Sequence, residues 1–281
     1  MAGGRIGPKS KARLIVSSPP RRNHPKGRPH GRFHGRPAAL PAGAEWVWGR
    51  HAVRAALANP RREALHRLVL APGRSVELQP EPDRPWPKPE TMEPQELSRL
   101  LPQGAVHQGF ALLAAPPEPA AIADIAEPAE GLILMLDQVT DPQNIGAILR
   151  SATAFGARGV VLQDRHAPQL SGALAKAAAG AVDAIPVVRA VNLSRALEEL
   201  SERGWRAVGL AGEAEGELDQ VLDAAPTVLV LGSEGEGLRR LVSEHCDVLA
   251  KIAMPGGFES LNVATAAAIA LYEAAKARRP R

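Results

Sequence analysis

From residue 131 onward the sequence alternates short apolar runs with longer segments of helical periodicity, and this alternation constrains the fold more than any other feature. The apolar runs predict buried strands at Leu132–Leu136, Val160–Leu162, Ile185–Val188, Ala207–Leu210, Val228–Leu231 and Val248–Ala253. The segments between them predict helices over about 144–155, Leu170–Ala179, Leu193–Arg203 and about 259–277. Such alternation is typical of an α/β fold, in which helices cover both faces of a mostly parallel sheet. Ligands then bind in the loops beyond the carboxyl ends of the strands.

A smaller α/β domain is expected upstream, over residues 45–115. Its predicted elements are a helix over His51–Asn59, a strand at Leu68–Leu70, a short helix over Glu96–Leu101 and a strand over Gly109–Leu113. Residues 78–94 contain six prolines, so we expect a loop there rather than a packed element. The acidic, proline-rich stretch 116–130 is expected to be a linker to the domain at 131–281.

The net charge of +4 comes from one segment of the chain. Residues 1–44 carry ten of the 34 Lys and Arg residues and no Asp or Glu, which leaves 24 basic and 30 acidic residues in the remainder. The segment is also rich in Gly and Pro, so we predict a disordered basic arm. Two interpretations stay open, an electrostatic tether for RNA phosphates and a solvated tail without a dedicated partner.

Several classes of protein are disfavoured by the composition. No run of about 18 apolar residues is free of charge or proline, and the basic N-terminus lacks the apolar region of a secretory signal. The single cysteine, Cys246, cannot form an internal disulfide, and nothing near it has metal-ligand spacing. We therefore expect a cytoplasmic protein with no membrane segment.

The loop after Leu136 is polar, contains Pro142 and opens a helix that holds Asn144 and Arg150. An amide and a guanidinium at the start of a helix could bind a phosphate or a ribose hydroxyl. An ordinary N-cap and a surface cation would give the same pattern, so this loop alone does not decide between the two interpretations.

The loop after Leu231 reads G-S-E-G-E-G and begins at Gly232. No Lys-Ser/Thr pair follows the glycines, and the spacing is not that of the dinucleotide fingerprint, so neither phosphate-binding motif is present. Glycines allow the backbone to approach a ligand closely, and the two carboxylates suit a cationic or hydroxyl-bearing ligand such as a sulfonium nucleoside. A third polar segment, with Ser260 and Asn262, opens the last helix and could be a simple N-cap.

Together the three segments are more specific than any one of them. The patterns N-I-G-x-x-x-R, G-S-E-G-E-G and S-L-N-V, in this order over residues 131–278, resemble the three motifs of the SpoU/TrmH (SPOUT) RNA 2'-O-ribose methyltransferases. Trp48–Val53 and His107–Gly109 resemble, more loosely, the ends of the small substrate-binding domain in the rRNA guanosine methyltransferase branch. The basic arm and the proline-rich loop depart from shorter members.

The resemblance implies a parallel-sheet SPOUT domain with a C-terminal trefoil knot, a homodimer whose two subunits complete the active site, and S-adenosyl-L-methionine as cofactor without a metal. Gly232, Ile252 and Leu261 match positions that bracket the adenosine. The implied substrate is a ribose, and the family-level expectation is the ribose of a guanosine in 23S ribosomal RNA. A tRNA ribose and a non-catalytic role in ribosome assembly are the alternatives, and the small domain favours rRNA.

The resemblance also implies roles for five catalytic residues. Arg150 matches the residue that activates the 2'-hydroxyl, yet a guanidinium is almost never deprotonated in proteins. It is therefore either a base made neutral by its site or a charged group that stabilises the forming alkoxide, and we favour the second. Asn144 would orient Arg150 and the substrate phosphate. Glu234 and Asn262 would hold the loops and the ribose, with support from Ser260.

Overall fold

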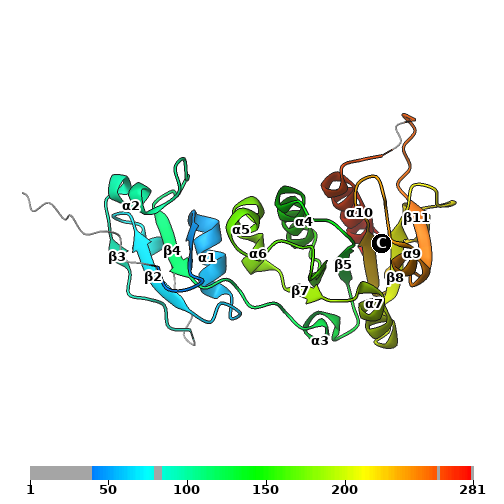
Figure 1. The fold of residues 1–281 in the computed structure, drawn as a ribbon, viewed down its shortest axis with the longest axis horizontal. Helices are drawn as coiled ribbons and strands as arrows, with labels where there is room; N and C mark the ends of the chain where they lie inside the picture. Colours follow the sequence, from blue (N-terminus) through cyan, green and yellow to red (C-terminus); the bar gives the residue numbers. More distant parts are fainter. Residues whose placement is uncertain (1–39, 79–83, 258–259, 280–281) are drawn as a thin grey trace, which may run out of the picture. The chain divides into compact units, whose positions relative to one another are not determined.

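The computed structural model describes residues 40–78, 84–257 and 260–279, and the structural statements below refer to these ranges. Most of the predicted basic arm, residues 1–39, lies outside them. From Leu40 onward the chain forms one compact unit that contains two sheets. Figure 1 shows the two sheets with their helices.

The smaller sheet has four strands in the order β1-β4-β2-β3. The strands are β1 (Glu45–Trp48), β2 (Leu65–Leu70), β3 (Glu90–Thr91) and β4 (Phe110–Ala114). Helix α1 (Arg50–Ala58) and helix α2 (Pro94–Leu100) cover opposite faces of this sheet, because Leu68 and Leu70 share a core with α1 whereas Val69 packs with α2. This domain also holds a short 3-10 helix, Ser75–Glu77.

The larger sheet has seven strands in the order β7-β6-β5-β10-β8-β11-β9, and all its pairings are parallel. The strands are β5 (Leu132–Leu136), β6 (Gly159–Gln163), β7 (Val187–Ala190), β8 (Arg206–Leu210), β9 (Gly216–Glu217), β10 (Thr227–Leu231) and β11 (Val248–Lys251). The prediction of a parallel sheet is confirmed. Each central strand is buried on both faces, which explains its continuous apolar run.

Helices cover both faces of the larger sheet. One face carries α4 (Pro142–Ala154), α5 (Gly172–Ala178), α6 (Ala181–Ala184), α8 (Leu218–Val221) and α10 (Val263–Ala277). The other carries α3 (Ile122–Ala126), α7 (Leu193–Glu202) and α9 (Arg240–Glu244). The helix layer with α4 and α10 is the one that borders the predicted site.

Three details differ from the expectations. The stretch 116–130, expected to be a linker, contains α3, whose Ile125 is fully buried in the core of the larger domain. The stretch as a whole is acidic and proline-rich, so its composition does not indicate the short apolar segment that forms α3. In the proline-rich stretch 78–94, strand β3 pairs with β2, so part of that stretch is a sheet edge. The last helix begins at Val263 rather than near residue 259, because Asn262 is its N-cap.

No helix among the described residues is both long and apolar enough to cross a membrane. The same part of the chain holds no group of three or more His, Cys, Asp or Glu side chains arranged to bind a metal ion.

Candidate active site

The loops that follow β5 and β10 begin side by side at one edge of the larger sheet. The two strands pair in register, with Leu136 opposite Leu231, and the amide N–H of Asp137 donates to the carbonyl oxygen of Leu231 at 2.8 Å. Because every strand of this sheet is parallel, the loop after β11 leaves from the same edge. The edge therefore gathers the three segments that the motifs identified.

A hydrogen-bonded set of three side chains joins these segments. Glu234 Oε1 accepts from Asn262 Nδ2 at 2.7 Å and from Asn144 Nδ2 at 3.3 Å. Asn262 Nδ2 also lies 3.0 Å from Asn144 Oδ1. A third donor, the backbone N–H of Val263, reaches Glu234 Oε1 at 3.1 Å. The carboxylate of Glu234 thus joins Asn144, which lies 90 residues before it in the chain, to Asn262, which lies 28 residues after it.

Asn262 has two structural tasks at once. Its Oδ1 caps α10 by accepting from the amide groups of Ala264 and Thr265 at 3.0 and 3.3 Å. Its Nδ2 donates into the three-residue set, so this one side chain both caps the helix and joins the three motif segments. Asn144 is placed by the first turn of α4, where Asp141 caps the helix and Pro142 occupies its start.

The glycine-rich loop after β10 folds tightly on itself. Ser233 and Gly237 exchange two backbone hydrogen bonds of 3.2 and 3.1 Å. A Cβ at Gly232 would lie 2.1 Å from the backbone carbon and oxygen of Gly237, so no other residue fits there. The loop presents backbone groups, and the side chain of Glu234 extends from its exposed part.

A buried carboxylate fastens this loop to the end of β5. Asp137 is fully buried, and its oxygens accept from the Nε of Arg239 at 2.7 Å and from the backbone N–H of Arg239 at 2.9 Å. Its Oδ1 also lies 2.6 Å from Arg239 Nη2. Our sequence reasoning missed this pair. The available signal was a charged residue directly after an all-apolar strand and an arginine two residues after the last glycine of the loop.

The other predicted residues lie around this set without joining it. Arg150 is exposed on α4, six residues beyond Asn144, and it makes no hydrogen bond or ion pair with any described residue. Ser260 is exposed and likewise has no side-chain hydrogen bond within the described ranges. Ile252 and Leu261 are half-buried, and Ile252 packs against the core beneath the α4–α10 layer.

This edge has the groups that an adenosine-type ligand needs. Half-buried aliphatic side chains, Ile252 and Leu261, can contact an aromatic base, while the folded loop from Gly232 to Gly237 offers backbone donors and acceptors. Gly235 and Gly256 have open space where a Cβ would stand. A ligand can therefore approach the backbone closely at both loops.

Cys246 lies behind this edge and has no nucleophilic role. Burial raises the pKa of its thiol to about 12, and the carboxylates of Asp247 and Asp137 add to the shift. Its Sγ donates to the carbonyl oxygen of Val242 at 3.3 Å. The thiol therefore stays protonated at neutral pH and packs as a small apolar group.

Comparison with known proteins identifies the class to which this fold and site belong. A model of the SpoU rRNA Methylase family matches residues 131–272, and a model described as RNA 2'-O ribose methyltransferase substrate binding matches residues 46–120. The chain therefore belongs to the SpoU rRNA methylase family of RNA 2'-O-methyltransferases, as its three motifs predicted.

Particular relatives and structures are similar along most of the chain. The 23S rRNA (guanosine-2'-O-)-methyltransferase RlmB of Pseudomonas aeruginosa is 40% identical, over 84% of this chain and 98% of that protein. The RlmB of Pseudomonas syringae pv. tomato is 39% identical, over 83% and 96%. The structure of an AdoMet-bound rRNA methyltransferase from Sinorhizobium meliloti matches with a TM-score of 0.68 and 27% identity, covering 83% of this chain and 87% of that one. The SpoU methyltransferase AviRb from Streptomyces viridochromogenes matches with a TM-score of 0.67 and 25% identity, covering 84% and 90%.

Proposed function

We propose that this protein transfers a methyl group from S-adenosyl-L-methionine to the ribose 2'-hydroxyl of a guanosine in 23S ribosomal RNA. The observation that carries the proposal is the hydrogen-bonded set of Asn144, Glu234 and Asn262, which unites the three motif loops at one sheet edge. The names of the RlmB relatives, with nearly full-length coverage, support the guanosine and the 23S substrate.

The cofactor site in this proposal is formed by the loops after β10 and β11. Gly232, Ile252 and Leu261 would hold the adenosine, through backbone groups and aliphatic contacts. S-adenosyl-L-methionine supplies a methyl carbon made electrophilic by its sulfonium. Asp137 and Arg239 keep the glycine-rich loop in place, because their bonds fix Arg239, two residues after the last glycine of the loop, to the end of β5.

The RNA-facing part of the site belongs to α4. Arg150 has no partner among the described residues, so its guanidinium is available to an incoming ribose and phosphate. We assign it the stabilisation of the developing 2'-alkoxide by its fixed positive charge, while the hydroxyl proton passes to solvent water as the methyl group is transferred. Asn144 orients the substrate from the start of the same helix, while Glu234 and Asn262 hold the three loops together. Ser260, exposed before the cap of α10, is assigned a supporting contact.

The quaternary and cellular assignments are also proposals. We infer a homodimer, and an exposed aromatic pair on the α4–α10 layer supports it: Phe155 and Tyr272 are 36% and 46% exposed, and their rings meet edge to face with centroids 6.1 Å apart. Exposed aromatic side chains in contact with one another are typical of a protein interface, where a partner subunit covers them, rather than of a surface that faces solvent. We further propose a trefoil knot in the C-terminal part, a division into domains at 45–115 and 131–281 with α3 of the connecting stretch packed on the second domain, and a cytoplasmic location.

Ribose methylation mapping decides the substrate. In RNA from a strain lacking the gene, one guanosine of 23S rRNA should lose its 2'-O-methyl group, and the wild-type gene should restore it. Loss of methylation in tRNA alone would replace the 23S assignment with the tRNA alternative. If neither RNA changes and calorimetry detects no binding of S-adenosylhomocysteine, the protein is not a methyltransferase.

Substitutions of Arg150 test its role. Arg150→Ala should lower kcat by about 10²–10³-fold, which is typical for removing one group that stabilises charge in a transition state, and should leave the Kd for S-adenosylhomocysteine unchanged. Arg195→Ala, an exposed arginine on α7 at the opposite face of the sheet, is the matched control and should keep full activity. Near-normal turnover by Arg150→Lys would show that the planar guanidinium itself is dispensable.

A further inference from the structure

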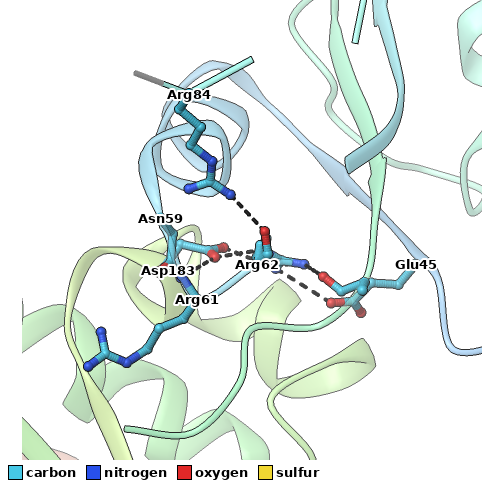
Figure 2. Close-up of polar contacts among 7 residues, drawn as sticks. Glu45, Asn59, Arg61, Arg62, Arg84 and Asp183 are labelled. Atoms are coloured by element: carbon cyan, nitrogen blue, oxygen red, sulfur yellow. Dashed lines mark hydrogen bonds and ion pairs between the residues drawn. The ribbon is translucent and has the colours of Figure 1, made fainter. Parts of the chain in front are cut away.

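An arginine is among the largest fully buried side chains of the protein. Arg62 lies between α1 and β2, and its side chain is 0% exposed. Its Nε donates to Asp183 Oδ1 at 2.6 Å and its Nη2 donates to Asp183 Oδ2 at 3.0 Å, which is the bidentate geometry of a strong ion pair. Its Nη1 donates to the carbonyl oxygen of Ala115, at the exit from the small domain. Figure 2 shows this arrangement.

The partner carboxylate comes from the other domain. Asp183 lies on α6 of the larger domain, 121 residues after Arg62, and its side chain is 1% exposed. It also accepts from Asn59 Nδ2, at the end of α1, at 2.9 Å. Glu45, the first residue of β1, lies 3.6 Å from Arg62 Nη2 (Figure 2). One guanidinium thus contacts the start of the small domain, its exit and the larger domain.

Close backbone packing accompanies the ion pair. Gly180, in the turn between α5 and α6, has a φ of +95°, and a Cβ there would lie 2.8 Å from the Cα of Ala52 on α1. The glycine is required both by its backbone conformation and by this approach. Helix α1 therefore rests directly on the α5–α6 turn. We call this contact, with Arg62, Asp183, Asn59, Gly180 and Ala52, the domain junction.

The junction connects to the helix that carries the RNA-facing residues. Helix α5, which precedes the α5–α6 turn, packs tightly on α4, because a Cβ at Gly146 of α4 would lie 2.5 Å from the Cβ of Ala177 on α5. Asn144 and Arg150 are on α4. The small domain thus contacts the α5–α6 turn, and α5 in turn packs on the helix that holds these two residues. Helix α6 of the junction leads to β7 at one end of the strand order, whereas the predicted cofactor loops follow β10 and β11, which β6 and β5 separate from β7.

We propose that Arg62 and Asp183 are positioning residues that hold the substrate-binding domain in one orientation, so that RNA bound to it presents its ribose at Arg150. This inference rests on the proposed function. Two buried charges cost much desolvation, so a hydrophobic pair would stabilise the chain at least as well. A bidentate pair fixes direction as well as distance, and that is what delivery of one ribose requires.

The neighbouring residue provides a matched control. Arg61 also pairs with an acidic residue downstream, Asp124, with Nη2 and Oδ2 2.8 Å apart, but these side chains are 30% and 46% exposed. The two pairs share chemistry and position in the sequence. They differ in burial, so Arg61→Ala changes a surface pair and leaves the junction intact.

The central variant removes both charges of the pair, so neither Arg62 nor Asp183 is left buried without its partner. In Arg62→Met/Asp183→Leu both partners become apolar, so the protein should fold with near-normal stability. Orientation is then no longer fixed. We expect the KM for a 23S rRNA fragment to rise at least tenfold, whereas the Kd for S-adenosylhomocysteine, measured by calorimetry, stays within twofold. Gly180→Ala places a Cβ against α1 and leaves the ion pair in place. It should likewise raise the KM for the RNA fragment without changing the Kd for S-adenosylhomocysteine.

A distance measurement tests the orientation without using activity. Spin labels at Val76→Cys in the small domain and Val191→Cys in the larger domain, in a Cys246→Ser background, use two sites that are 81% and 68% exposed. The distance distribution should be narrow in the unaltered junction and with Arg61→Ala, and broad in Arg62→Met/Asp183→Leu. A distribution that stays narrow, or an RNA KM that stays normal, would overturn the proposal. If wild-type protein does not methylate 23S rRNA, the proposed function fails while the distance result still judges the junction.

Discussion

The candidate active-site edge and the domain junction each centre on one carboxylate, and the two carboxylates differ in their exposure to water. At the edge, Glu234 accepts from two asparagine side chains and one backbone amide, and its own side chain is exposed. At the junction, Asp183 accepts from Arg62 and Asn59, and its side chain is 1% exposed. In both places one carboxylate joins segments that are distant in the sequence.

The difference in burial separates two uses of polar side chains. A polar group that binds a ligand must stay accessible to solvent. The protein therefore satisfies only some of its hydrogen bonds, and water supplies the others until a ligand binds. A buried charge must be satisfied entirely by the protein, because an unpaired charge without water is very costly. The edge is therefore suited to binding, whereas the junction is suited to holding the chain in one arrangement.

The largest expected effect concerns stability and tests this separation directly. Asp183→Ala leaves Arg62 buried without its partner, so the free energy of unfolding should fall by about 3–5 kcal/mol. Glu234→Ala removes an exposed acceptor and should cost about 1 kcal/mol or less. Urea denaturation followed by circular dichroism measures both. Equal losses for the two variants would mean that burial does not distinguish the networks.

The fold was predictable because burial on both faces leaves a clear mark in the sequence. Strands such as Leu132–Leu136 and Val228–Leu231 are continuous apolar runs, and each lies where it was expected. The site segments were predictable because glycine, proline and polar residues interrupt these runs at strand ends. The short helices α3, α6 and α9 are too brief to show a helical period, and they were missed as separate elements.

Pairs of charges were not predictable for a different reason. Arg62 and Asp183 are 121 residues apart, and Asp137 and Arg239 are 102 apart. Each pair depends on which elements are neighbours in space, and periodicity does not give the strand order. Arg62 also stands next to Arg61 in an otherwise ordinary polar stretch, so nothing local marks it as the buried one of the two.

An intermediate case sharpens the comparison. The pair of Asp137 and Arg239 joins a fully buried carboxylate to a guanidinium whose side chain is 40% exposed. Arg239→Ala removes the side-chain donors but keeps the backbone N–H bond to Asp137, so we expect a loss of about 2 kcal/mol in the free energy of unfolding. Because the pair fastens the glycine-rich loop, the affinity for S-adenosylhomocysteine should fall as well.

The adjacent residue is the control for this variant. Arg240 pairs with Glu244 on the surface, and its side chain is 76% exposed. Arg240→Ala should change the unfolding free energy by no more than about 0.5 kcal/mol and leave cofactor affinity unchanged. A loss in Arg240→Ala as large as that in Arg239→Ala would show that the loop responds to net charge rather than to the bond with Asp137.

Apart from the control variants, the smallest expected effect is a pH dependence that reports whether water reaches the thiol of Cys246 in the folded protein. Burial raises the pKa of the Cys246 thiol to about 12 from an ordinary value of 9.0. Below about pH 9 the thiol is protonated in both the folded and the unfolded chain, so its titration does not change stability. Between about pH 9 and pH 12 only the unfolded chain loses this proton, so a rise in pH favours unfolding. At pH 9.5 the unfolding free energy of the wild type should have dropped by about 0.8 kcal/mol more, relative to pH 7, than that of Cys246→Ala. Paired urea denaturations at the two pH values measure this difference, because other titrating groups are common to both proteins. If the unfolding free energy of both proteins falls by the same amount, water reaches the thiol in the folded state. The surroundings of Cys246 would then resemble the exposed edge rather than the buried junction.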